Sequence, residues 1–136
     1  MAQITHIDHI AIVVDKIDSA MEFWRDSLGL ELSHVQEVPE QASTVAFFSV
    51  GKSELELVQP TTDGSGVARF LQKHGPGMHH ICFAVDDLAA TLLRLKSRGV
   101  RLINDTPQLL ASGKKIAFIH PESAHGVLVE LYEQAG

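Results

Sequence analysis

Two stretches of the chain, MHHICFAVD (Met78–Asp86) and IDHIAIVVD (Ile7–Asp15), carry the same pattern of residues. When they are superposed, His9 falls on His80, and each stretch continues through apolar residues to an aspartate. Side chains alternate between the two faces of a strand, so adjacent histidines point to opposite faces. The comparison therefore selects His80, and not His79, as the histidine with an equivalent in the other stretch.

The repeat continues beyond these two strands. Each is followed by an amphipathic run that ends in glycine, at Gly29 in one copy and Gly99 in the other. Further on, ELELV matches LVELY, which superposes Glu56 on Glu130. The offset is 71 residues at the histidines and 74 at the glutamates, so a short insertion separates the copies. Three matches in the same order indicate an internal repeat.

Each copy predicts a strand, a helix and three further strands. The expected strands lie near 5–14, 30–37, 44–50 and 53–59 in the first copy, and near 79–86, 100–104, 115–120 and 126–132 in the second. We therefore expect an α+β fold in one domain, residues 1–136, made of two βαβββ modules (about 5–59 and 79–132). The modules would form a concave eight-stranded mixed sheet around a metal site.

The helices have recognisable ends and apolar sides. Asp18 and Asp87 are candidate N-caps of the two module helices. The side chains expected to face the core are Ala20, Phe23, Trp24 and Leu28 in the first helix, and Leu88, Leu92 and Leu95 in the second. Ser65 would cap a short helix that joins the modules and ends at Gly75 and Pro76.

The alternation rule places four metal-ligand candidates at equivalent positions. Each strand histidine, His9 or His80, shares its face with small residues, while the bulky residues of the other face pack on the helix. Two modules related by a pseudo-twofold axis would bring these histidines together with Glu56 and Glu130. Two imidazoles and two carboxylates can hold one divalent cation and leave coordination positions open. We expect Co, Mn, Ni or Zn, the metals that this ligand set favours.

Composition restricts the partners. The net charge of −6 argues against nucleic acid. No apolar run reaches the roughly 18–20 residues that a membrane span needs. Cys82 is the only cysteine, so a disulfide framework is excluded. Together with the lack of a signal-peptide pattern in residues 1–20, this predicts a cytoplasmic protein.

Five stretches resemble a known family from end to end of the chain: IDHIAIVV, VPEQAS, ELELVQP, FLQKHGPGMHHICFAVDD and FIHPESAHGVLVELYE. They are similar to the methylmalonyl-CoA epimerases of the vicinal oxygen chelate (glyoxalase/bleomycin resistance/dioxygenase) superfamily. The resemblance implies metal ligands at His9, Glu56, His80 and Glu130, with Glu130 also acting as an acid/base group. It implies an isomerase and a homodimer. The implied reaction interconverts (R)- and (S)-methylmalonyl-CoA, an acyl-CoA thioester, by removing and returning the C2 proton through a metal-stabilised enolate.

The chain departs from this family at two positions. Some epimerases carry a second catalytic glutamate in the strand after the PEQG motif; here that position is Val45, and the glycine of the motif is Ala42. We therefore expect Glu56 to supply the second base as well as a metal ligand. Lys114 and Lys115 could meet the anionic CoA part, or they could belong to a solvated hairpin.

Two alternatives remain open. A glyoxalase I-type lactoylglutathione lyase uses the same four-ligand scheme. A non-catalytic small-molecule-binding protein of the same fold would lack the metal and have an aromatic-lined groove. Aromatic residues make up only 6% of the chain, which weighs against this second alternative.

Overall fold

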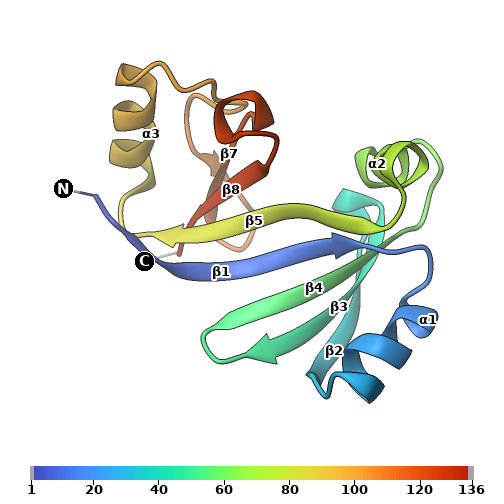
Figure 1. Cartoon of the computed structure of the whole chain (residues 1–136). Coiled ribbons are helices and arrows are strands. Elements are labelled where there is room, and N and C mark those ends of the chain that lie inside the picture. Colours follow the sequence, from blue (N-terminus) through green and yellow to red (C-terminus); the bar gives the residue numbers. More distant parts are fainter. Residues whose placement is uncertain (1, 135–136) are drawn as a thin grey trace. The chain divides into compact units, whose positions relative to one another are not determined.

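The computed structural model describes residues 2–134 and contains, within that range, three α-helices and eight strands (Figure 1). The chain divides into two compact units. Residues 9–79 make the first unit, and residues 2–8 with 80–134 make the second. In the described part of the chain, no helix is long and apolar enough to cross a membrane.

Four strands run through the first unit, in the order β2-β3-β4-β1, with β1 belonging to it from His9 onward. Their bounds are β1 (Ile4–Val13), β2 (Glu31–Val38), β3 (Ser43–Val50) and β4 (Ser53–Pro60). β1 and β4 are parallel, whereas β3 is antiparallel to both β2 and β4. In the parallel pair, Ala11 stands opposite Glu56.

The second unit repeats this arrangement, with strand order β5-β8-β7-β6. Its strands are β5 (Gly77–Val85), β6 (Gln108–Leu109), β7 (Lys115–Ile119) and β8 (Leu128–Glu133). β5 and β8 are parallel, and Cys82 stands opposite Glu130, as Ala11 stands opposite Glu56. The predicted α+β fold with eight strands of mixed direction is confirmed.

The strand predicted near 100–104 is wrong. Leu102 makes only an isolated bridge with Ile119, and the edge strand β6 forms at residues 108–109 instead. The cause is Asn104, whose side-chain oxygen accepts a hydrogen bond of 2.8 Å from the backbone N–H of Phe118. The Asn104 side chain accepts the hydrogen bond that a backbone carbonyl would accept in a regular strand pair. Backbone pairing of residues 100–104 with β7 therefore does not extend beyond the bridge at Leu102.

Two of the predicted helix caps are confirmed. The Asp87 carboxylate accepts a hydrogen bond from the Ala90 N–H at 3.0 Å and begins α3 (Leu88–Ser97). The Ser65 hydroxyl oxygen accepts one from the Ala68 N–H at 3.0 Å and begins α2 (Gly66–His74). Side-chain acceptors at this position satisfy backbone donors that have no partner within the helix.

The first module helix differs from its prediction. α1 (Ile17–Met21) begins after Lys16, so Asp18 lies inside the first turn and is not the cap. The chain then widens into a π-helix, η1 (Glu22–Ser27). In this helix the Leu28 N–H donates to the Phe23 carbonyl at 2.8 Å, five residues back.

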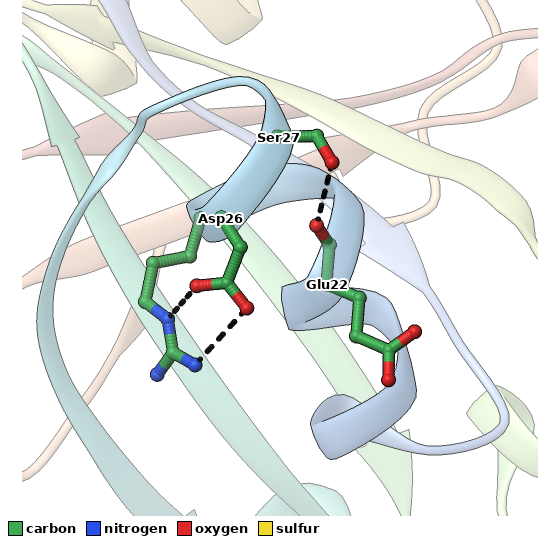
Figure 2. Close-up of polar contacts among 4 residues, drawn as sticks. Glu22, Asp26 and Ser27 are labelled. Carbon is green, nitrogen blue, oxygen red and sulfur yellow. Dashed lines mark hydrogen bonds and ion pairs between the residues drawn. The ribbon is translucent and has the colours of Figure 1, made fainter.

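Side chains make polar contacts along the π-helix (Figure 2). The Ser27 hydroxyl donates to the Glu22 carbonyl at 3.0 Å, and the Arg25 guanidinium donates to the Asp26 carboxylate at 2.8 Å. The hydrogen bond from Arg25 holds the pKa of the Asp26 carboxyl below its usual value. Both of these charged side chains lie on the surface of the helix.

The wider turn changes which side chains face the core. Trp24 packs against the cluster that contains Ile17 and Met21. Phe23 and Leu28, however, are 54% and 53% exposed, so their predicted core positions are wrong. A helix whose bonded groups are five positions apart does not keep the 3.6-residue stripe on which that prediction rested.

Each unit has its main core on the helix-covered face of its sheet. In the first unit this core includes Phe48, Leu57 and Met21. In the second it includes Leu131 together with Leu92 of α3. This arrangement confirms that the bulky face of each strand packs on a helix.

The opposite face of the first unit is less open than expected. Ala11 is fully buried in a second cluster with Val45 and Val58. Apolar side chains therefore fill the room that the small residue next to His9 was expected to leave.

Ala42 adopts a conformation that favours glycine, with φ 48° and ψ 48°. The left-handed region costs a residue with a Cβ about 1–2 kcal/mol, and glycine avoids this cost. The greater conformational freedom of glycine in the unfolded chain offsets about 0.5–1 kcal/mol of the resulting gain in stability. We expect Ala42→Gly to raise the melting temperature by about 2–4 °C in calorimetry. Ala111→Gly, an exposed turn residue outside the positive-φ positions, is the control and should not stabilise. A lower melting temperature for Ala42→Gly would show that the left-handed backbone conformation does not strain residue 42.

Candidate metal and active site

The first unit holds one imidazole–carboxylate pair. His9 on β1 and Glu56 on β4 come from adjacent parallel strands, and the His9 Nδ1 lies 3.5 Å from the Glu56 Oε2. Their side chains are 12% and 16% exposed, so both are largely removed from water yet still accessible. The pair lies on the face opposite the main core, as alternation predicts.

The second unit holds the equivalent pair. The His80 Nε2 on β5 lies 3.1 Å from the Glu130 Oε1 on β8, and the side chains are 15% and 12% exposed. The His80 ring also meets the Phe118 ring edge-on, with 6.2 Å between centroids. The structure thus pairs each predicted histidine with the glutamate of its own module.

His79 has different surroundings. Its ring meets the Phe70 ring of α2 edge-on, with 5.0 Å between centroids. Phe70 also stacks on His74, at 4.6 Å. His79 thus takes part in an aromatic contact with the linking helix, and its exclusion from the ligand set stays a prediction.

The chemistry and spacing of the pairs fit a divalent cation. Imidazole nitrogen and carboxylate oxygen are ligands of Co, Mn, Ni and Zn. Two such ligands, each about 2.1 Å from one ion, stand about 3.0–3.4 Å apart in octahedral or tetrahedral geometry. The separations of 3.1 Å and 3.5 Å within the pairs are close to this range.

The position of the missing second glutamate is apolar. Val45 is 2% exposed and packs with Ala11 and Val58. Glu40, the nearest carboxylate in sequence before it, is exposed in a short 3-10 turn, η2 (Pro39–Gln41). Val45 itself therefore contributes no acid or base to this face.

Lys114 and Lys115, which have the same expected role in the sequence, have different partners in the structure. The Lys114 Nζ lies 5.0 Å from the centre of the Tyr132 ring, whereas the Lys115 Nζ lies 3.6 Å from the Glu133 carboxylate. The two lysines can be assigned to faces only when the residue of β7 that stands opposite Glu130 is known. That residue depends on the register between β7 and β8, which the sequence does not give.

Comparison with known proteins identifies the family of the chain. The profile of the Glyoxalase/Bleomycin resistance protein/Dioxygenase superfamily matches residues 8–118. Uncharacterized protein YqjC of Bacillus subtilis (strain 168) is 46% identical over 96% of this chain and 93% of its own. The mitochondrial methylmalonyl-CoA epimerase of Mus musculus is 39% identical over 95% of this chain and 72% of its own. A methylmalonyl-CoA epimerase solved in complex with methylmalonyl-CoA and NH4+ has a TM-score of 0.85 at 36% identity, covering 98% of this chain and 97% of its own. The chain therefore belongs to the glyoxalase/bleomycin resistance protein/dioxygenase superfamily and, within it, to the methylmalonyl-CoA epimerase group of isomerases.

Proposed function

We propose that this protein interconverts (R)- and (S)-methylmalonyl-CoA by removing the C2 proton and returning it to the opposite face. We propose further that His9, Glu56, His80 and Glu130 together hold one divalent cation. The observation that carries the proposal is the pair of largely buried imidazole–carboxylate contacts, 3.5 Å and 3.1 Å, at equivalent positions of the two copies. Epimerases similar over nearly the whole chain support the choice of substrate.

The substrate explains why such a site is useful. C2 of methylmalonyl-CoA lies between a carboxylate and a thioester carbonyl, so negative charge spreads over their oxygens when the proton leaves. When bound, the cation would supply Lewis-acid stabilisation of that charge, worth several kcal/mol. The rest of the chemistry is proton transfer, which the side chains of this chain must perform.

Inversion at C2 needs a base on one face and an acid on the other. Each such group typically contributes about 10²–10⁴-fold to the rate. We assign Glu130 to one face and Glu56 to the other, because the repeat makes them equivalent and because Val45 is apolar. Limited exposure of both carboxylates keeps bulk water from competing for the proton.

Two further features belong to the proposal. A homodimer is suggested by family resemblance, and sedimentation at micromolar concentration should then give twice the monomer mass of 14.9 kDa. A cytoplasmic location is suggested by the single cysteine in the sequence.

Isotope exchange tests the function directly. Purified protein loaded with Co²⁺ or Mn²⁺ and mixed with (S)-methylmalonyl-CoA in D₂O should incorporate deuterium at C2 and produce the (R) form, followed by NMR and chiral analysis. The hemithioacetal of glutathione and methylglyoxal is the control substrate and should remain unchanged. Conversion of the hemithioacetal with no exchange at C2 would favour a lactoylglutathione lyase and overturn the proposal.

A further inference from the structure

Lys115 is the first residue of β7, which lies beside β8 (Figure 1), and Lys114 directly precedes it. Because neighbouring side chains of an extended chain alternate, the two lysines approach opposite faces of the sheet. Lys115 stands opposite Glu133. Phe118 stands opposite Glu130. Lys114, directly before β7, is four residues from Phe118, an even number. Lys114 therefore approaches the face that carries Glu130, and Lys115 approaches the face covered by α3.

The contacts of Lys115 account for its presence. Its Nζ lies 3.6 Å from the Glu133 Oε2. The other oxygen of the same carboxylate, Oε1, accepts a hydrogen bond of 2.7 Å from the Leu88 N–H at the start of α3. Lys115 thus supports the start of α3, which is a structural role.

The contacts of Lys114 are of another kind. Its Nζ lies 5.0 Å from the centre of the Tyr132 ring, within the range of a cation–π interaction. Tyr132 follows Glu130 by two residues on β8, so the ring lies on the same face, about 7 Å along the strand. The ring therefore holds an exposed ammonium group on the same face as the His80–Glu130 pair.

We propose that Lys114, positioned by Tyr132, binds the free carboxylate of the 2-methylmalonyl thioester and so selects 2-carboxyacyl thioesters over neutral acyl thioesters. This inference rests on the proposed function. Glu130 must contact the C2 proton, and the substrate carboxylate is bonded directly to C2. The phosphates of CoA lie at the far end of the long pantetheine arm, well beyond the step of about 7 Å between Glu130 and Tyr132.

Charge supports the same assignment. The chain has a net charge of −6, and Glu130 adds a carboxylate to the very face that must receive an anionic acyl group. An ammonium on that face offsets the repulsion between the two carboxylates. Charge-assisted hydrogen bonds from Lys to carboxylate are stronger than neutral ones.

A matched pair of variants tests the inference. Lys114→Gln should raise the Kd of the metal-loaded protein for methylmalonyl-CoA about tenfold in calorimetry and raise KM in parallel, with kcat changed much less. The Kd values for propionyl-CoA and for free CoA should stay as in the parent protein. Lys115→Gln should leave all three Kd values unchanged and lower only the melting temperature. Lys114→Arg should restore binding of methylmalonyl-CoA. Tyr132→Leu should weaken this binding, whereas Tyr132→Phe keeps the ring and should leave the binding unchanged.

The outcomes separate the inference from the proposed function. Parental affinity of Lys114→Gln for methylmalonyl-CoA, in a parent protein that epimerises it, overturns the inference alone. Equal weakening for all three ligands would mean that Lys114 meets the CoA part, which also overturns it. A parent protein that neither binds nor epimerises methylmalonyl-CoA overturns the proposed function, and the inference with it.

Discussion

Replacing His80 with alanine is expected to abolish tight binding of a divalent cation, while replacing its neighbour His79 is expected to leave binding intact. His80 is 3.1 Å from the Glu130 carboxylate, whereas the ring of His79 meets Phe70. Loss of a residue that only supports a metal ligand typically costs about 10–100-fold in affinity. Loss of the imidazole itself should therefore cost at least about 100-fold.

The measurement does not depend on activity. Metal content after dialysis against Co²⁺ or Mn²⁺, and calorimetric titration with the same ions, should give about one ion per chain for the parent protein and for His79→Ala. A cation at 100 times its Kd stabilises the folded state by about 2.7 kcal/mol. His80→Ala should lose this metal-dependent rise in melting temperature, and His79→Ala should keep it.

The opposite pattern would mean that β5 is displaced by one residue, since a shift of one exchanges the faces of all its side chains. Equal and undiminished binding by both variants would remove His80 from the ligand set. His9→Ala, in the other copy, should reproduce the loss seen with His80→Ala.

The features of the fold that follow from local periodicity could be predicted from the sequence. Alternation along a strand has a period of two, so the repeat alone selected His80 and paired Glu56 with Glu130. The caps at Asp87 and Ser65 could be predicted for the same reason, since a cap depends on residues within one turn.

The features that were missed depend on contacts distant in sequence or on one unusual hydrogen bond. The apolar pattern predicts Phe23 in the core, but Phe23 is exposed. The hydrogen bond from the Leu28 N–H to the Phe23 carbonyl defines the π-helix, and it leaves no signature in that pattern. The strand near 100–104 was lost to a single side chain, Asn104, that bonds a residue 14 positions away. Lys114 could be separated from Lys115 only with the register of β7 on β8.

Loss of one base should uncouple proton exchange from inversion, and this is the second large effect that we expect. Glu56→Gln retains a neutral oxygen that can bind a cation but removes one carboxylate base. Glu130 can still take the C2 proton from one enantiomer and return it to the same face. This variant should therefore exchange the C2 proton of that enantiomer with D₂O while interconverting the enantiomers about 10²–10⁴-fold more slowly.

The mirror variant and a nearby control make the test specific. Glu130→Gln should prefer the other enantiomer for exchange. Glu54→Gln changes the residue two positions before Glu56, on the same face of β4, and should behave as the parent protein does. Metal content is measured for each variant, so that loss of the ion is not mistaken for loss of a base.

If Glu56→Gln, with metal bound, interconverts the enantiomers at the parental rate, then Glu56 is a ligand only. The second base must in that case come from elsewhere in the chain, and Glu40, exposed in the turn before β3, is the next carboxylate to replace.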